Sequence, residues 1–280
     1  MKPRAAAEQG TRGNTRKTEA LRRLAIHGFD AVAGSHNFFA LLEFDITRLR
    51  GLLREQRVHG DGGSLFAFLL KAIGHALALH PECNAMVNLR RTTTFGEVDI
   101  AIPVEVVVDG TRVNRQYIIR TITAQTVAEV DREIETAREN REGETGFLSS
   151  RTAQRLLAAL PRCIVHALFG LVLRNHQRVR ELSGTVFVTS VSMFTNVPGA
   201  IIPFVGGPKA SSFAIGSAMK KPMVHRGSIQ IREMINITVS FNHDAVDGAP
   251  AARCINTLRR LIERDYTDLL GPATHHAPSS

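Results

Sequence analysis

The sequence has few cysteines, few aromatic residues and no long apolar run, and each shortage excludes a class of protein. Its 280 residues include only three cysteines, Cys83, Cys163 and Cys254, which lie far apart and form no Cys-x-x-Cys pair. Neither a disulfide framework nor a cysteine zinc site is predicted, so we expect no bound metal. A reducing, cytoplasmic location is favoured for the same reason.

The longest apolar stretch, from Cys163 to Leu173, is interrupted by His166 and is too short to cross a bilayer. No apolar run follows the charged residues 1–17, so no signal peptide is predicted. The sequence therefore indicates a protein without a membrane partner.

The formal net charge is +9, whereas aromatic residues make up only 6% of the chain. Such a charge permits an acidic partner, which would be either nucleic acid or the phosphates of a cofactor. The basic residues are scattered outside the N-terminal tail, and few aromatic side chains are available. We therefore expect no nucleic-acid partner.

Hydrophobic residues make up 44% of the chain, which is enough to bury the core of one large domain. Residues 1–17 are predicted to be a flexible basic tail, residues 18–272 the folded domain and residues 273–280 a flexible C-terminal tail. Apolar periodicity predicts strands interleaved with helices, and hence a mixed sheet covered by helices. The predicted strands are 37–47, 95–108, 112–120, 184–194, 213–217 and 235–241, and the predicted helices are 18–27, 48–57, 64–79, 126–140, 151–180 with a break at Pro161, and 249–263. A hairpin is predicted at residues 223–231.

The stretch from Ser240 to Gly248 organises the chain. It places His243 between a strand with alternating apolar residues and an amphipathic helix, with Asp247 four residues later. Gly248 is expected to give this loop the backbone freedom to double back. A histidine near a carboxylate suits general-base chemistry at neutral pH. The spacing alone leaves open a second interpretation, a surface turn that contains a histidine and two aspartates.

Several stretches in the right order resemble one family. The strongest are the His-x-x-x-Asp-Gly stretch with its flanks, from Thr238 to Arg253, and the glycine-led strand Gly184–Ser190. Weaker matches lie at residues 38–47, 81–85 and 215–216. From about Arg22 to Leu270 the chain is similar to the catalytic domain of dihydrolipoyl acyltransferases from 2-oxoacid dehydrogenase complexes, which shares its fold with chloramphenicol acetyltransferase.

The resemblance implies an α/β (α+β) two-layer sandwich of the chloramphenicol acetyltransferase type and a homotrimer with active sites between subunits. It implies that His243 is the general base and that a hydroxyl from the facing subunit, Thr189 or else Ser190, stabilises the oxyanion. Asp247 would hold the loop through an ion pair with Arg22. Coenzyme A would be the acyl carrier, with Lys220 and Lys221 as candidates to bind its phosphates.

Three departures from the family pattern favour a stand-alone enzyme. Residues 112–119 replace the family's Gly-Leu-Val-Val-Pro strand. Asp244 stands where the family usually has arginine, and a helical segment at about 152–180 is inserted. We therefore expect an acyl-CoA-dependent acyltransferase, without a lipoyl domain, that transfers an acetyl or other short acyl group to a hydroxyl or thiol of a small-molecule acceptor. The alternatives are a dihydrolipoyl acyltransferase core component of a 2-oxoacid dehydrogenase complex and a catalytically inactive trimeric scaffold.

Overall fold

The computed structural model describes residues 20–58, 63–108, 111–139, 156–191, 199–203 and 205–270. The predicted tails, at residues 1–17 and 273–280, lie outside these ranges. The helices are α1 (Ala20–Val32), α2 (Thr47–Val58), α3 (Leu65–Leu79), α4 (Val127–Glu139), α6 (Arg162–Leu173), α7 (His176–Ser183), α8 (Gly248–Glu263) and α9 (Thr267–Leu270), with short 3-10 turns at Pro81–Cys83 and Ile122–Ala124. The strands are β1 (Asn37–Asp45), β2 (Ala85–Asn88), β3 (Arg91–Thr94), β4 (Ile100–Val108), β5 (Thr111–Ile119), β6 (Val186–Ser190), β7 (Ser211–His225) and β8 (Ser228–Asn242).

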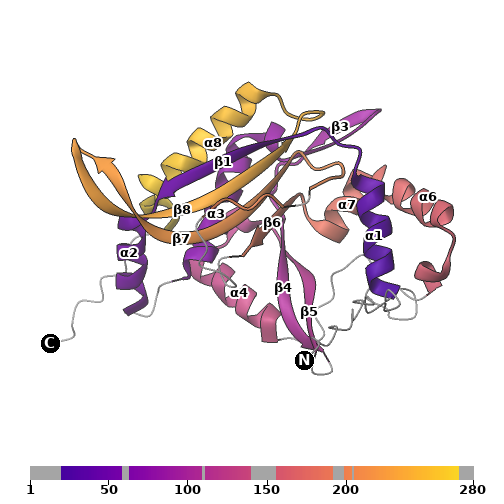
Figure 1. Cartoon of the computed structure of the whole chain (residues 1–280), viewed down its shortest axis with the longest axis horizontal. Helices are drawn as coiled ribbons and strands as arrows, with labels where there is room; N and C mark the ends of the chain where they lie inside the picture. The colour runs from indigo at the N-terminus through magenta and orange to yellow at the C-terminus, as the bar shows by residue number, and fades with distance from the viewer. Residues whose placement is uncertain are drawn as a thin grey trace, which may run out of the picture.

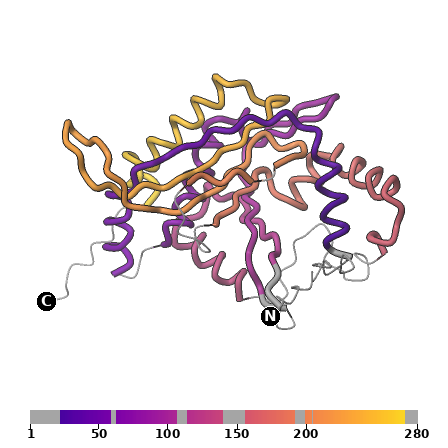
Figure 2. The backbone as a smooth tube through the Cα atoms, in the orientation of Figure 1, coloured from indigo at the N-terminus to yellow at the C-terminus, as the bar shows by residue number. Residues whose placement is uncertain are grey.

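A six-stranded mixed sheet in the order β1-β8-β7-β6-β4-β5 forms the centre of the fold (Figure 1). The pairs β4–β6 and β6–β7 are parallel, and the other neighbours are antiparallel. β1 and β8 come from opposite ends of the chain, and the whole of β1 runs beside residues 234–242 of β8 (Figure 2). β2 and β3 form a separate small hairpin.

One face of the sheet is covered by α3 and α8. The apolar residues of both helices join those of β8, β7, β6 and β4 in one buried cluster. Ser64 begins α3 as expected, because its Oγ accepts a hydrogen bond from the Ala67 N–H at 3.1 Å. The predicted two-layer sandwich of a mixed sheet and helices is confirmed. None of the helices in the described ranges is long and apolar enough to span a membrane.

Two predicted strands differ from the observed ones. The segment 95–108 was expected to be one strand, but β4 begins only at Ile100, because Asn84 binds the carbonyls of Phe95 and Glu97 and holds that part as a loop. Pro103 is tolerated inside β4, since pairing with β6 involves only Ile100 and Ala101. Of the predicted strand 184–194, β6 covers Val186–Ser190, and residues 192–194 lie outside the described ranges.

The segment predicted as the strand 213–217 and a hairpin at residues 223–231 is part of one long hairpin. β7 and β8 pair from Ser211↔Phe241 to His225↔Ser228, and a register shift between Ile215 and Ala218 interrupts the ladder. The predicted turn at Arg226 and Gly227 is present, and both residues have positive φ angles of 50° and 78°.

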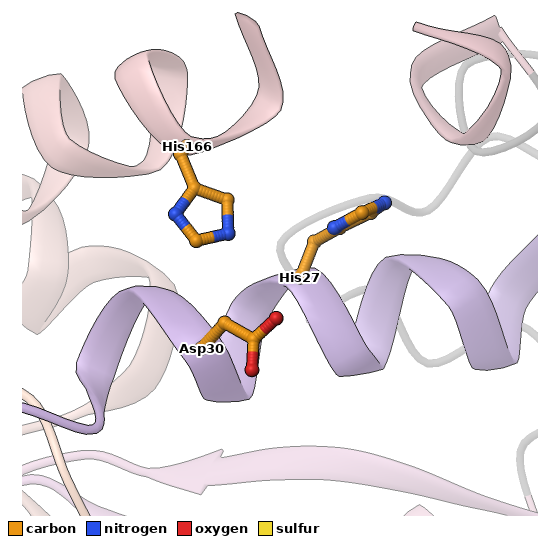
Figure 3. Close-up of side chains that lie close together, drawn as sticks. All are labelled: His27, Asp30 and His166. Carbon is orange, nitrogen blue, oxygen red and sulfur yellow. The ribbon is translucent and has the colours of Figure 1, made fainter. Parts of the chain in front are cut away.

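The predicted helical segment at 152–180 contains α6, which starts after Pro161 as expected. It also contains most of α7, but the sequence did not predict that α6 and α7 are separate helices. α6 packs against α1, and a side chain at Gly28 would meet the ring of Phe169 at 3.7 Å. The close approach brings His27 and Asp30 of α1 near His166 of α6 (Figure 3).

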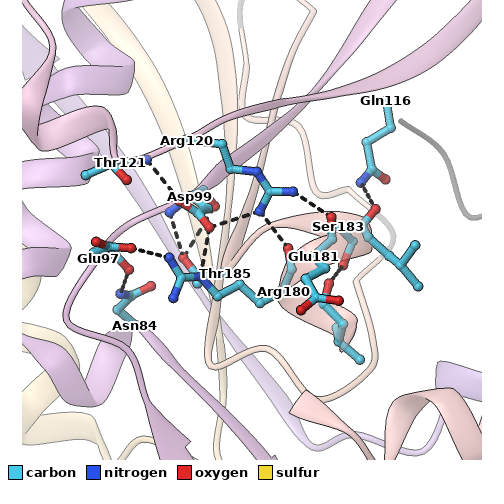
Figure 4. A network of polar contacts seen from close by, with 12 residues as sticks. Asn84, Glu97, Asp99, Gln116, Arg120, Thr121, Arg180, Glu181, Ser183 and Thr185 are labelled. Atoms are coloured by element: carbon cyan, nitrogen blue, oxygen red, sulfur yellow. Dashed lines mark hydrogen bonds and ion pairs between the residues drawn. The ribbon is translucent and has the colours of Figure 1, made fainter. Parts of the chain in front are cut away.

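α7 is fixed to the sheet by the buried carboxylate of Asp99 (Figure 4). Asp99 Oδ2 accepts from Arg180 Nε at 2.8 Å and from Arg120 at 3.0 Å, and Oδ1 accepts from the Thr121 N–H at 2.9 Å. Gly184 ends α7 with a φ of 66°, and a Cβ there would lie 2.6 Å from the Asp99 carbonyl oxygen. The sequence thus needs glycine where α7 meets β4.

The charge of Asp99 is stabilised by these donors. Burial alone would raise its pKa, but the hydrogen bonds from Arg180, Thr121 and Arg120 outweigh this effect, so the pKa is lowered. A lowered native pKa stabilises the fold above the unfolded-state value of about 3.9, and this contribution is lost as the pH falls through the native value.

We expect Asp99→Ala to lower the free energy of unfolding by about 3 to 5 kcal/mol, because it leaves Arg180 and Arg120 without their shared partner. Urea denaturation at neutral pH measures this loss. The control is Glu135→Ala, which removes an exposed pair with Arg138 and should cost less than about 1 kcal/mol. Equal losses in the two variants would contradict this assignment. So would a difference in free energy of unfolding between wild type and Asp99→Ala that does not become smaller below about pH 4.

Candidate active site

His243 lies in the tight turn between β8 and α8, as the sequence predicts. Asn242 builds this turn: its carbonyl accepts from the N–H groups of Ala245 and Val246, both at 3.0 Å, and its side-chain oxygen accepts from the Asp244 N–H at 3.0 Å. Val246 is buried in the core and anchors the end of the turn. His243 therefore projects from a backbone that is fixed on both sides.

Two residues near the start of the chain support His243, and the sequence did not single them out. The His243 N–H donates to the His36 carbonyl at 2.7 Å, and the imidazole lies 5.3 Å from the ring of Phe38. Phe38 in turn stacks on Phe241, its partner across β1 and β8. Only the pairing of β1 with β8 brings these residues together, so no local pattern could have identified them.

The carboxylates of the turn are divided between two histidines. Asp247 Oδ1 lies 3.6 Å from His243 Nδ1, and Asp244 Oδ1 lies 2.9 Å from His36 Nδ1. The His243 and Asp247 side chains are 57% and 83% exposed, so solvent screens their attraction. This arrangement turns Nδ1 of His243 toward Asp247 and leaves Nε2 as the atom that can accept a proton.

Two details of the predicted loop differ from expectation. Gly248 is the first residue of α8, has no positive φ, and a side chain there would meet nothing within 4 Å. The turn is thus made by Asn242 and does not need the backbone freedom predicted for Gly248. Arg22 lies exposed on α1, and no ion pair joins it to Asp247 within the described part of this single chain.

The pleat of the sheet separates Thr189 from Ser190. Thr189 is level with Ala214 and Thr238 on neighbouring strands, in a row that ends at the exposed Leu41. This row lies on the face that neither α3 nor α8 covers, the uncovered face, where Thr189 is partly buried and Ala214 and Thr238 are nonetheless buried. Ser190 shares its row with Ile215 and Ile237, which belong to the core beneath the helices. Adjacent residues of a strand point to opposite faces, so only Thr189 lies on the uncovered face.

Within one chain Thr189 and His243 are far apart. His243 lies five residues beyond Thr238, and Thr238 is separated from Thr189 by β7. With about 3.3 Å per residue along a strand and about 4.8 Å between strands, the two residues are about 19 Å apart. A single protomer therefore cannot bring this hydroxyl to this imidazole.

Lys220 and Lys221 also lie far from His243 within the protomer. They pair with Glu233 and Arg232, ten or more residues before His243 on β8, which corresponds to more than about 30 Å. Lys221 forms an ion pair with Glu43 of β1. The two lysines and the histidine do not form one site in a single chain.

Comparison with known proteins identifies the C-terminal part of the chain. Residues 165–270 match the family model of the 2-oxoacid dehydrogenases acyltransferase (catalytic domain). This segment of the chain is thus similar to the acyltransferase family. It includes β6, β7, β8 and α8, and hence His243, Asp247 and Thr189.

Two curated relatives match over most of this chain. The lipoamide acyltransferase component of the branched-chain alpha-keto acid dehydrogenase complex of Pseudomonas putida is 25% identical over 278 residues, which cover 94% of this chain and 57% of that protein. The acetyltransferase component of the pyruvate dehydrogenase complex of Corynebacterium glutamicum is also 25% identical, over 90% of this chain and 34% of that protein. The chain thus spans about a third to somewhat over half of these two relatives.

Solved structures share the fold of this chain. The cubic core of the pyruvate dehydrogenase multienzyme complex superposes with a TM-score of 0.67 at 16% identity, covering 97% of this chain and 100% of that one. Dihydrolipoamide acetyltransferase of Azotobacter vinelandii gives a TM-score of 0.66 at 18% identity, with the same coverage. The expected fold is confirmed by these core structures.

Thr238 supplies a test of the uncovered face. Its hydroxyl is buried and has no hydrogen-bond partner among the described residues of the protomer. We expect Thr238→Val to leave the free energy of unfolding unchanged or to raise it by up to about 1 kcal/mol, because the desolvated hydroxyl is removed without loss of a bond.

The matched control is Ser211→Ala, which removes a buried hydroxyl that donates to the Cys83 carbonyl at 2.8 Å and should cost about 1 kcal/mol. Thermal and urea unfolding of both variants measure the difference. If Thr238→Val costs as much as Ser211→Ala, the Thr238 hydroxyl has a partner in the assembled protein.

Proposed function

We propose that the protein is a dihydrolipoyl acyltransferase that transfers an acyl group between a dihydrolipoyl thiol and coenzyme A, with His243 as the general base. The observation that carries this proposal is His243 in a rigid turn with Nε2 free to accept a proton, inside the segment that matches the acyltransferase family. The names of the relatives from Pseudomonas putida and Corynebacterium glutamicum supply the substrate class.

In the proposed reaction His243 Nε2 removes the proton from the thiol of coenzyme A. The resulting thiolate attacks the carbonyl carbon of the acyl-dihydrolipoyl thioester, and the carbonyl oxygen becomes an oxyanion. When this intermediate collapses, the bond between carbon and the dihydrolipoyl sulfur breaks, and that sulfur takes the proton from His243. Asp247 and Phe38 orient the imidazole throughout.

Thr189 is proposed to donate its hydroxyl to the oxyanion. Its row on the uncovered face supports this choice over Ser190, which shares a row with core isoleucines. The structure of the Azotobacter vinelandii enzyme was used to study a serine, a histidine and an asparagine in catalysis, and the last two are four residues apart, like His243 and Asp247. The set proposed here likewise contains a hydroxyl, an imidazole and a polar residue.

The separation of about 19 Å between Thr189 and His243 favours a site shared by two protomers of a homotrimer. The exposed Phe39 and Leu41 on the same face support contact with a second copy. Arg22, Lys220 and Lys221 would then act on the site of a neighbouring protomer. A small-molecule acceptor is the second candidate. Asp244, which binds His36, places a carboxylate in the catalytic turn and so alters the charge of that turn.

We expect His243→Ala to lower kcat with dihydrolipoamide and acyl-CoA by about 10²- to 10⁴-fold, because the proposed general base for the thiol proton is removed. Thr189→Ala should lower kcat by about 10²- to 10³-fold with little change in KM, since the donor acts mainly in the transition state. Release of the coenzyme A thiol during steady-state turnover measures both.

Ser190→Ala is the matched control and should keep nearly the wild-type kcat. A larger loss in Ser190→Ala than in Thr189→Ala would reverse their roles. Activity of the wild-type protein with hydroxylated or thiol small molecules but not with dihydrolipoamide would favour the second candidate.

Mixed assembly tests the shared site. When His243→Ala and Thr189→Ala chains are co-refolded in equal amounts, random trimers contain intact sites at about a quarter of their interfaces, so activity should return to about that fraction of the wild-type value. Separately folded and unmixed variants provide the background. No recovery in trimers shown by mass to be mixed would place each site within one protomer.

A further inference from the structure

Two imidazoles and one carboxylate meet between α1 and α6, away from the proposed catalytic turn. One nitrogen or oxygen from each of His27, Asp30 and His166 lies within 4.8 Å of the other two (Figure 3). His27 and Asp30 are three residues apart on α1 and so share one face of the helix. We infer that these three side chains form a binding site for a divalent transition-metal ion such as Zn²⁺.

The ligand set fits such an ion. Zn²⁺ binds imidazole nitrogen and carboxylate oxygen, often as two histidines and one acid with a fourth position open. At metal–ligand lengths of about 2.0 to 2.1 Å, tetrahedral ligand atoms lie about 3.4 Å from one another. The three side chains therefore need to close by no more than about 1.4 Å. Mg²⁺ and Ca²⁺ prefer oxygen ligands and should not bind here.

An unpartnered nitrogen supports the inference. His27 Nδ1 is buried and has no hydrogen-bond partner in the described part of the chain. Buried polar atoms normally have a partner, because desolvation without one is costly. The ring of His166 faces His27 edge to face, with 6.1 Å between centroids. A metal ion between the helices would satisfy this nitrogen and join the rings.

The site already attracts a positive charge. Arg162 donates to Asp30 Oδ2 at 2.8 Å, and its Nε lies 3.5 Å from His166 Nε2. The Arg162 side chain is 66% exposed, so it can leave the carboxylate at little cost. A divalent ion would replace one guanidinium on Asp30 and gain two imidazoles in addition.

A metal ion bound here would hold α1 and α6 together. α1 leads into β1, and the carbonyl of Val32 at its end accepts from the Gly207 N–H at 3.0 Å. α6 belongs to the segment of about 152–180 that the family resemblance marks as inserted. Cysteine spacing gave no sign of such a site, since its ligands come from residues 27–30 and 166 and meet only in the folded chain.

Titration of the full chain with Zn²⁺ tests the inference, in a background where His275 and His276 are replaced by alanine, because adjacent histidines bind metal by themselves. We expect one saturable site by calorimetry, a higher Tm with Zn²⁺ than without it, and no effect of Mg²⁺. Co²⁺ in place of Zn²⁺ should give the visible absorption of a low-symmetry site.

His166→Ala and Asp30→Asn should each weaken Zn²⁺ binding by more than about tenfold. Removal of a direct ligand should cost at least as much as a change in a residue outside the ligand set, which can already produce a loss of this size. Arg162→Ala should keep or tighten binding, and His225→Ala, at the tip of the β7–β8 hairpin, should leave it unchanged. Circular dichroism and Tm without metal show that each variant is folded.

Absence of saturable Zn²⁺ binding to the background protein would overturn the site. Binding that is equally tight in His166→Ala, or that appears only in Arg162→Ala, would overturn it as well. The readouts are affinity, Tm and Co²⁺ absorption, so they do not depend on acyltransferase activity.

Discussion

The pairing of β8 with β1 on one side and β7 on the other is the constraint on which the candidate site depends. It places the carbonyl of His36 and the ring of Phe38 against His243, and it holds Asn242 where it can close the turn. No residue of the turn has a positive φ angle, and the turn contains no buried charge. Its rigidity comes from hydrogen bonds to elements that are already fixed in the sheet.

The same sheet assigns the faces on which chemistry can take place. α3 and α8 cover one face with a continuous apolar core, so side chains in the rows of Ile215 and Ile237 are directed into that core. Residues in the alternate rows, among them Thr189 and Thr238, lie on the other face. Because the side-chain period of a strand is two, a shift of one residue would exchange these roles.

The helical segment beside the sheet is held by buried ion pairs together with a small apolar cluster of Met86, Phe95 and Val179. α7 is fixed to β4 by the buried Asp99 and two arginines, whereas α6 keeps several large apolar side chains exposed. Its contact with α1 contains two histidines and a carboxylate in addition to the approach of Phe169 to Gly28. A cation bound by these side chains would join the two helices.

The sequence by itself determined most of the element types, a mixed sheet covered by helices and the position of His243 between a strand and a helix, because periods of 2 and 3.6 residues and turn residues are local signals. It did not determine that β7 is one long strand, that β4 starts at Ile100, or that Asn242 and not Gly248 makes the turn. Those features arise from hydrogen bonds between distant segments. The support of His243 by Phe38, the face on which Thr189 lies and the meeting of His27 with His166 were likewise decided only by the tertiary structure, since each depends on which strands and helices become neighbours.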